Sequence, residues 1–166
     1  TRLAPGAFLA LALLLVFTFT ARADDYACTG SVESIKVDNL YVPAGETCTL
    51  NGTRVEGNIF VESSATLHAY AVRVNGNIQT GSGAARVNVY SGSSVLGSIQ
   101  IVSSGAALIQ DVKIYGDLFF DDNDLSLSAD GNKIDGNLQA FQNTGGVSIT
   151  GNKIDGDLQC KENDPA

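Results

Sequence analysis

The sequence is poor in the residues that most often carry metal or catalytic chemistry. Its 166 residues include one histidine, His68, and three cysteines. No phosphate-binding loop, zinc-ligand spacing or catalytic triad is present, and His68 has no evident serine or cysteine partner. We therefore predict no cofactor, no metal site and no catalytic residues, and we favour a protein that is not an enzyme.

Basic residues are also scarce. Ten Lys and Arg stand against eighteen Asp and Glu, which gives a formal net charge of −8 at pH 7. A domain that binds nucleic acid needs a basic footprint to meet the phosphate backbone. We therefore expect no nucleic-acid partner.

Only one apolar run approaches the length of a membrane span. Residues 3–21 carry no charge, Arg2 precedes them, and Ala21-Arg22-Ala23 has a small-x-small cleavage pattern. This layout favours a secretory signal peptide over residues 1–23 rather than a membrane anchor. The remaining 143 residues keep eight basic and eighteen acidic side chains, a net charge of −10. We expect a secreted, extracellular protein with no membrane span after cleavage.

A repeat of about twenty residues dominates the rest of the chain. A glycine, a small polar residue and then Ile or Leu recur in steps of 19, 21, 19, 20 and 20 residues. The copies are Gly57-Asn58-Ile59, Gly76-Asn77-Ile78, Gly97-Ser98-Ile99, Gly116-Asp117-Leu118, Gly136-Asn137-Leu138 and Gly156-Asp157-Leu158. A β-branched residue lies two positions before each glycine: Val55, Val74, Val95, Ile114, Ile134 and Ile154. Residues 35–42 form a degenerate copy without the glycine.

Such a repeat predicts an all-β parallel β-helix, also called a β-solenoid. One short coil cannot bury its own apolar residues, but stacked coils turn equivalent positions into continuous ladders. We expect six to seven coils of about 20 residues, with three strands per coil and a triangular section. We expect the solenoid to be right-handed, because the strict six-residue period of left-handed solenoids is missing. With coils about 4.8 Å apart the rod is about 30 Å long. An antiparallel sandwich or barrel is less favoured, since it does not require such close positional matching.

The predicted organisation has four parts. Residues 1–23 are the signal peptide, 24–37 an N-terminal cap or degenerate coil, 38–160 the β-helix, and 161–166 a truncated C-terminal tail. Within the β-helix, the Ile and Leu after each polar residue point inward, and the polar residues form a corner ladder. The glycines mark corners with unusual backbone angles. A middle strand contributes an inward row: Leu67, Val87, Leu108, Leu127 and Val147.

A basic stripe appears once the copies are aligned. Three residues before each glycine, or at the matching place in the degenerate copy, lie Lys36, Arg54, Arg73, Lys113, Lys133 and Lys153, with Ser94 interrupting the row. Alternation along a strand points this row outward. Asp38, Glu56, Asp135 and Asp155 lie two residues along on the same side. The stripe is either a solvated ion-pair face or a track for an anionic polymer such as an extracellular or cell-wall polysaccharide.

A second outward row combines amides and aromatic rings: Tyr41, Phe60, Gln79, Gln100, Phe119, Gln139 and Gln159. Stacked amides and rings stabilise cross-β ladders, so structural stacking is favoured over sugar binding. The acidic run at residues 121–124 fits no calcium-loop spacing, and a solvated loop is favoured over a calcium site.

The three cysteines are expected to pair in an oxidising compartment. Cys28 and Cys48 lie nine and seven residues before Val37 and Val55, at similar phases of adjacent coils. We predict that they form a disulfide at the N-terminal end. Cys160 is the odd one, and we expect its partner to lie beyond Ala166.

The phrases GNKIDGNLQA at 131–140 and GNKIDGDLQC at 151–160 carry a resemblance. The chain is similar to uncharacterised secreted bacterial single-stranded β-helix repeat proteins that carry GNLQC-type phrases near the C-terminus. More loosely, it resembles the pectate-lyase-like superfamily and the bactofilin filament proteins. The first resemblance implies a further cysteine past this point, which fits the expectation for Cys160. The acidic calcium ligands of pectate-lyase-like enzymes have no clear counterpart here.

These observations predict a secreted, non-enzymatic β-helix with a structural role or a role in binding an extracellular surface or polysaccharide. A polysaccharide-active lyase or hydrolase is the first alternative. A head-to-tail filament is the second, because unpaired end coils invite polymerisation. The sequence leaves the oligomeric state open.

Overall fold

The computed structural model describes residues 25–165, and the predicted signal peptide lies outside this range. The described chain consists of short β-strands and turns. Within it there is no helix long and apolar enough to cross a membrane. The predicted all-β class is confirmed.

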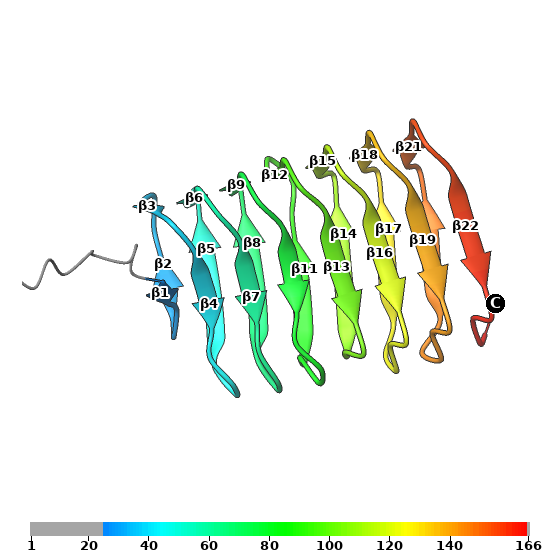
Figure 1. Ribbon diagram of the computed structural model, residues 1–166, viewed down its shortest axis with the longest axis horizontal. Coiled ribbons are helices and arrows are strands. Elements are labelled where there is room, and N and C mark those ends of the chain that lie inside the picture. The colour runs from blue at the N-terminus through cyan, green and yellow to red at the C-terminus, as the bar shows by residue number, and fades with distance from the viewer. Residues whose placement is uncertain (1–24, 166) are drawn as a thin grey trace, which may run out of the picture.

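The strands form three parallel sheets, and each pass of the chain adds one strand to each sheet (Figure 1). Sheet A comprises β1 (Tyr26–Ala27), β4 (Leu40–Val42), β7 (Ile59–Val61), β10 (Ile78–Thr80), β13 (Ile99–Val102), β16 (Leu118–Asp121), β19 (Leu138–Phe141) and β22 (Leu158–Lys161). Sheet B comprises β2 (Ser31–Val32), β5 (Thr47–Asn51), β8 (Thr66–Tyr70), β11 (Arg86–Val89), β14 (Ala106–Gln110), β17 (Leu127–Asp130) and β20 (Val147–Thr150). Sheet C comprises β3 (Lys36–Val37), β6 (Arg54–Val55), β9 (Arg73–Val74), β12 (Ser94–Val95), β15 (Lys113–Ile114), β18 (Lys133–Ile134) and β21 (Lys153–Ile154).

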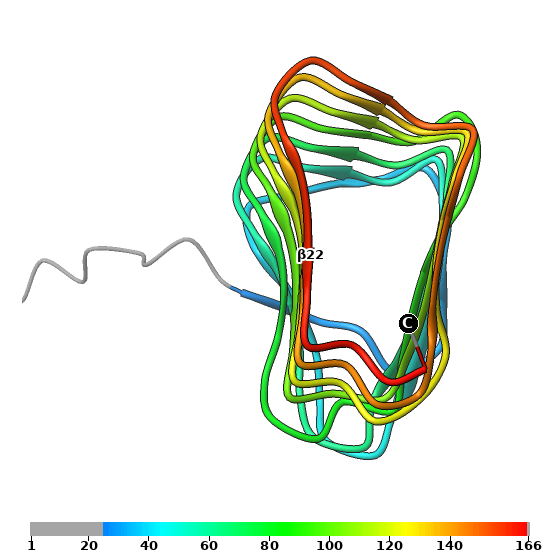
Figure 2. The ribbon, with the colours of Figure 1, turned by 90° about the vertical axis from the view of Figure 1, so that its right-hand side faces the viewer.

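The molecule is a β-solenoid in which each strand pairs only with its equivalents one coil before and one coil after. Seen from the C-terminal end, the chain runs anticlockwise while it advances toward the viewer, so the coil is right-handed (Figure 2). Sheets A and B form two long sides that face each other, sheet C closes one end, and the turns from sheet A to sheet B close the other. The section is oblong rather than the expected triangle, because the strands of sheet C have two residues each, whereas those of sheet B have up to five.

The core consists of stacked apolar ladders. In sheet A the register places Ile59, Ile78 and Ile99 directly over one another, and all three are fully buried. Val55 and Val74 do the same in sheet C. Each coil contributes too few apolar side chains to make a core alone, so burial depends on the coils on either side.

One predicted inward residue faces outward instead. The register of sheet B pairs Val87 with Ala107 and Ala107 with Leu127, while Leu108 pairs with Asn88 on the outer face. The inward prediction for Leu108 is therefore wrong. Side chains alternate along a strand, and here Ala107 and Ile109 occupy the two inward places.

The polar residues of the repeat form a ladder at the corner between sheets C and A. Each side-chain oxygen accepts a hydrogen bond from the backbone N–H of its counterpart one coil later, at 2.7–3.0 Å. The donors are the N–H groups of Asn58, Asn77, Ser98, Asp117, Asn137 and Asp157. Asn, Asp and Ser are interchangeable here because each offers an oxygen acceptor on a short side chain.

The glycine before each polar residue is needed for space. A Cβ added to Gly97 would lie 2.6 Å from the carbonyl oxygen of Gly76, and the other repeat glycines after Gly57 meet the same kind of contact. These glycines do not adopt a positive φ, so the expectation of unusual backbone angles is wrong for them. The first glycine of the GNKIDG phrase is the one that does: Gly131 has a φ of 66°.

Buried asparagines form two further ladders toward the C-terminal end. Asn132 lies between sheets B and C, where its Oδ1 accepts from the N–H of Val112 at 3.0 Å and its Nδ2 donates to the carbonyl of Ile109. Asn123 and Asn143 do the equivalent in the turns between sheets A and B. These amides satisfy backbone groups in the turns and in the strands that lead into them.

The first and last coils use the same contacts as the others. β1, β2 and β3 pair with β4, β5 and β6, so residues 25–37 of the predicted cap or degenerate coil belong to the stack. At the other end Lys161 is the last residue of β22, and Asn163 accepts from the N–H of Asn143 at 3.1 Å.

Candidate functional site

The basic residues singled out in the sequence come together on the outer face of sheet C. Each is the first residue of a two-residue strand whose second residue, Val or Ile, points into the core. The strands pair in register, so the side chains stack one per coil in the order Lys36, Arg54, Arg73, Ser94, Lys113, Lys133 and Lys153. We call this row the basic stripe.

A second row runs beside the basic stripe, two residues further along each coil, and we call it the companion row. Its members are Asp38, Glu56, Asn75, Leu96, Tyr115, Asp135 and Asp155. Carboxylates therefore accompany the stripe at both ends of the rod, whereas the middle three coils have an amide, an aliphatic and an aromatic side chain. The charge of the stripe is offset unevenly along its length.

At the N-terminal end Glu56 neutralises two cations. Its Oε1 lies 3.4 Å from the Nζ of Lys36 and 2.5 Å from the Nε of Arg54. Desolvation acts to raise the pKa of Glu56, but the hydrogen bonds from Arg54 and Lys36 outweigh it, and the pKa is lowered overall. The carboxylate is therefore charged at neutral pH and holds both partners.

Toward the C-terminal end Asp135 does the same for Lys133. The Nζ of Lys133 lies 2.9 Å from Oδ1 of Asp135. Their hydrogen bond lowers the pKa of Asp135 and raises the pKa of Lys133, so both are charged at neutral pH. Exposed pairs of this kind add little to stability, but they reduce the positive potential that an approaching anion meets.

Between and beyond these pairs, three cations of the stripe lie outside ion-pair distance of the described carboxylates. Within residues 25–165, Arg73, Lys113 and Lys153 make no ion pair with a carboxylate. The Nζ of Lys113 instead lies 2.8 Å from the hydroxyl of Tyr115 and 4.0 Å from the centroid of its ring. The contact holds the ammonium group at the surface without cancelling its charge.

The middle of this face is also hollowed and partly apolar. The residues that line this open recess are Arg54, Arg73, Val74, Asn75, Gly92, Ser94, Leu96 and Tyr115. Leu96 and Tyr115 remain 50% and 42% exposed, which is high for large apolar side chains. Unpaired cations, a hydroxyl and an aromatic ring on one surface suit an elongated anionic ligand that also has apolar edges.

Sequence reasoning found the basic stripe but missed Leu96 and Tyr115. Only the acidic members of the companion row were singled out, although the same alignment shows where the acids stop. Asn75, Leu96 and Tyr115 occupy the places of Glu56 and Asp135. The aligned sequence therefore already indicated the candidate site, because the acidic partners of the stripe are absent from these three coils.

The predicted amide and aromatic row lies on the outer face of sheet A, away from the basic stripe. The register aligns Tyr41, Phe60, Gln79, Gln100, Phe119, Gln139 and Gln159. Gln79 donates to Gln100 at 2.7 Å and Gln139 to Gln159 at 2.9 Å. Because these amides already bond to one another, the row contributes to strand stacking.

The predicted disulfide between Cys28 and Cys48 is confirmed, with Cα atoms 5.4 Å apart. Both residues are fully buried in the first two coils. Cys160 is exposed and unpaired within the described part of the chain, and its partner stays a prediction. A buried structural disulfide is consistent with an extracellular protein.

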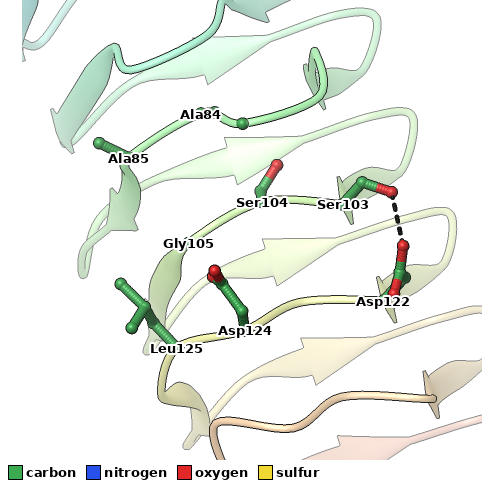
Figure 3. A pocket seen from close by; sticks show the side chains of 9 residues that line it. Ala84, Ala85, Ser103, Ser104, Gly105, Asp122, Asp124 and Leu125 are labelled. Carbon is green, nitrogen blue, oxygen red and sulfur yellow. Dashed lines mark hydrogen bonds between the residues drawn. The ribbon is translucent and has the colours of Figure 1, made fainter.

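The residues of the acidic run at 121–124 lie in different surroundings and do not form one cluster. Asn123 is buried in the turn ladder, and Asp122 accepts a hydrogen bond from Ser103 at 3.0 Å in a recess of the sheet A to sheet B turns (Figure 3). Asp124 lies further along the same turn, beside Leu125. Within residues 25–165 no three His, Cys, Asp or Glu side chains are grouped so that they could hold a metal ion.

His68 lies on the outer face of sheet B, where its register partners are Thr49 and Asn88. Its Nδ1 is 3.4 Å from Nδ2 of Asn88, and the neighbouring strand brings Arg86 close. Partial burial, and to a lesser extent the charge of Arg86, lower the pKa of His68. The ring is therefore neutral at physiological pH.

Comparison with known proteins gives no identity. No family model, curated protein or solved structure matches the chain. The resemblance to secreted bacterial β-helix proteins stays a prediction.

Proposed function

We propose that this protein is a secreted, non-enzymatic β-solenoid that binds an acidic extracellular or cell-wall polysaccharide along the outer face of sheet C. The observation that carries the proposal is the unpaired state of Arg73 and Lys113 beside a recess with the exposed Leu96 and Tyr115. If this surface were only a solvated ion-pair face, we would expect carboxylates in the companion row of these coils as well. Here an amide, an aliphatic and an aromatic side chain occupy the places of the carboxylates.

The shape of the face supports a polymer rather than a small molecule. The cations are arranged in one line parallel to the rod, one coil after another, and the recess is open. Small-molecule sites are usually concave and enclose most of their ligand. A linear ligand lying along the axis meets several coils at once, and its weak contacts act together.

The negative net charge of the chain supports binding of an anionic polymer at sheet C rather than elsewhere on the surface. The protein carries a formal charge of −8, so an anionic polymer is repelled from most of its surface. The unpaired cations of sheet C form a local exception, because several of them lie in one row. The Cys28–Cys48 disulfide and the predicted signal peptide support an extracellular location for the encounter.

The test is a binding measurement with immobilised polygalacturonate, hyaluronan and, as a neutral reference, dextran. The double change Arg73→Ala and Lys113→Ala should weaken binding to an acidic polymer about 2- to 30-fold, because each exposed charge contact contributes modestly. Binding should also become less sensitive to salt. Arg86→Ala is the matched control, since Arg86 is an exposed arginine on sheet B.

Two outcomes would overturn the proposal. One is that the folded protein binds none of the acidic polymers at low salt. The other is that Arg86→Ala weakens binding as much as the double change on sheet C does.

A further inference from the structure

The unpaired cations of sheet C recur on every second coil. Arg73, Lys113 and Lys153 make no ion pair within residues 25–165, while the coils between them carry Ser94 and the Asp135-bound Lys133. Neighbouring strands of a sheet are about 4.8 Å apart, so the unpaired charges repeat every ~10 Å along the rod.

We propose, resting on the polysaccharide-binding function above, that the preferred ligand is an acidic polysaccharide in which charged and uncharged residues alternate. One pyranose residue in an extended chain advances by roughly one strand spacing. A polymer with an acid on every second sugar therefore places its carboxylates at Arg73, Lys113 and Lys153 in turn. Its neutral sugars lie over the coils in between.

The coil between Arg73 and Lys113 suits an uncharged sugar. Ser94 offers a hydroxyl, and Leu96 in the same coil is half exposed. Tyr115 also lines the recess, and its ring can contact the apolar edge of a pyranose. A carboxylate held here would lose hydration against Leu96 and gain no cation of its own coil.

The coil of Lys133 disfavours a second carboxylate for a different reason. Lys133 is already paired with Asp135, so an acid at this coil must compete for an occupied cation, whereas Lys153 lies outside ion-pair distance of the described carboxylates, Asp155 included. A polymer with an acid on every sugar places one carboxylate at this coil and another at the coil of Ser94. The same spacing that fits an alternating polymer is thus unfavourable for a uniform one.

The experiment compares hyaluronan, which carries one carboxylate per disaccharide, with polygalacturonate, which carries one per residue. The two are matched for the number of carboxylates, and binding to the full mature chain is measured at several salt concentrations. We expect hyaluronan to bind about 3- to 10-fold more tightly per carboxylate.

Ser94→Arg provides the decisive variant, because it fills the uncharged coil. It should raise the affinity for polygalacturonate and reduce the preference for hyaluronan. Ser128→Arg is the matched control on the outer row of sheet B and should change neither. Circular dichroism before each titration checks that the added charge, which lies between two cations, leaves the fold intact.

The outcomes separate this inference from the function it rests on. Equal binding of the two polymers, with no effect of Ser94→Arg, would overturn the alternation and leave polysaccharide binding standing. Tighter binding of polygalacturonate by the unmodified protein would do the same. Failure of both polymers to bind would overturn the proposed function and the alternation with it.

Discussion

The backbone N–H of Asn77 donates to Oδ1 of Asn58 at 2.8 Å, and Oδ1 of Asn77 in turn accepts from the N–H of Ser98, also at 2.8 Å. Asn77 is thus linked through its backbone N–H to the coil before it and through its side chain to the coil after it. Because the link repeats at every corner between sheets C and A, it fixes the register of the coils that carry the basic stripe. The fold and the candidate site therefore depend on one ladder.

Removing one rung of the ladder should destabilise the solenoid. Asn77→Ala leaves the partly buried N–H of Ser98 without its acceptor, and an unsatisfied buried donor costs about 1–3 kcal/mol. Asn77→Asp should retain most of the stability, since Asp117 occupies the equivalent position two coils further along the same ladder. Urea unfolding followed by circular dichroism measures both. A loss for Asn77→Asp as large as that for Asn77→Ala would contradict the acceptor role.

The repeat glycines should not tolerate a methyl group. Gly97→Ala places a Cβ 2.6 Å from the carbonyl oxygen of Gly76, and since that atom belongs to the backbone the coil must shift. We expect a loss of about 1–3 kcal/mol in the free energy of unfolding. Gly30→Ala is the control, because an added Cβ there meets nothing within 4 Å. Equal stability of the two variants in urea would show that close packing does not explain the glycine.

The disulfide between the first two coils should stabilise the N-terminal end. Replacing both Cys28 and Cys48 by Ser removes a cross-link between residues 20 apart, which typically costs about 2–4 kcal/mol. The midpoint of thermal unfolding should fall accordingly. Cys160→Ser should leave it unchanged, since Cys160 is exposed. Mass spectrometry of the non-reduced protein that found only free thiols would contradict the pairing.

His68 should make stability depend on pH in the mildly acidic range. Its pKa in the folded protein lies below the ordinary value of 6.5, so the unfolded chain binds the proton more readily. The contribution of His68 is full above pH 6.5 and decreases as the pH falls toward its folded pKa. A histidine NMR titration checks the midpoint. Arg86→Ala should raise the pKa only partly, because burial is the larger cause.

Much of the architecture could be predicted because a solenoid repeats its physical requirements in every coil. Val55, Val74 and their equivalents recur two residues before a glycine, and such spacing leaves few folds other than stacked coils. The position of the basic stripe followed from the same alignment. The register within sheet B was harder to predict from the sequence, because Ala107, Leu108 and Ile109 are all apolar. The prediction therefore placed Leu108 in the core, where Ala107 and Ile109 lie.

Other features depend on contacts between coils that one coil does not reveal. The sequence shows Asn132 as one polar residue among many, and only its neighbours make it a buried partner of the Val112 N–H. The unpaired state of Arg73 likewise depends on Asn75 standing where Glu56 stands one coil earlier. The repeat identifies the equivalent positions, while the deviations from it distinguish the candidate site from the rest of the rod.

The most direct test of the central claim is to map the surface that an acidic oligosaccharide contacts. Isotope-labelled mature protein is titrated with a hyaluronan octasaccharide, and amide chemical shifts are followed by NMR. The proposal predicts saturable shifts centred on Arg73, Ser94, Lys113 and Tyr115, with those of sheet B around Arg86 unchanged. Shifts centred on sheet A or sheet B, or no shifts at millimolar ligand, would contradict it.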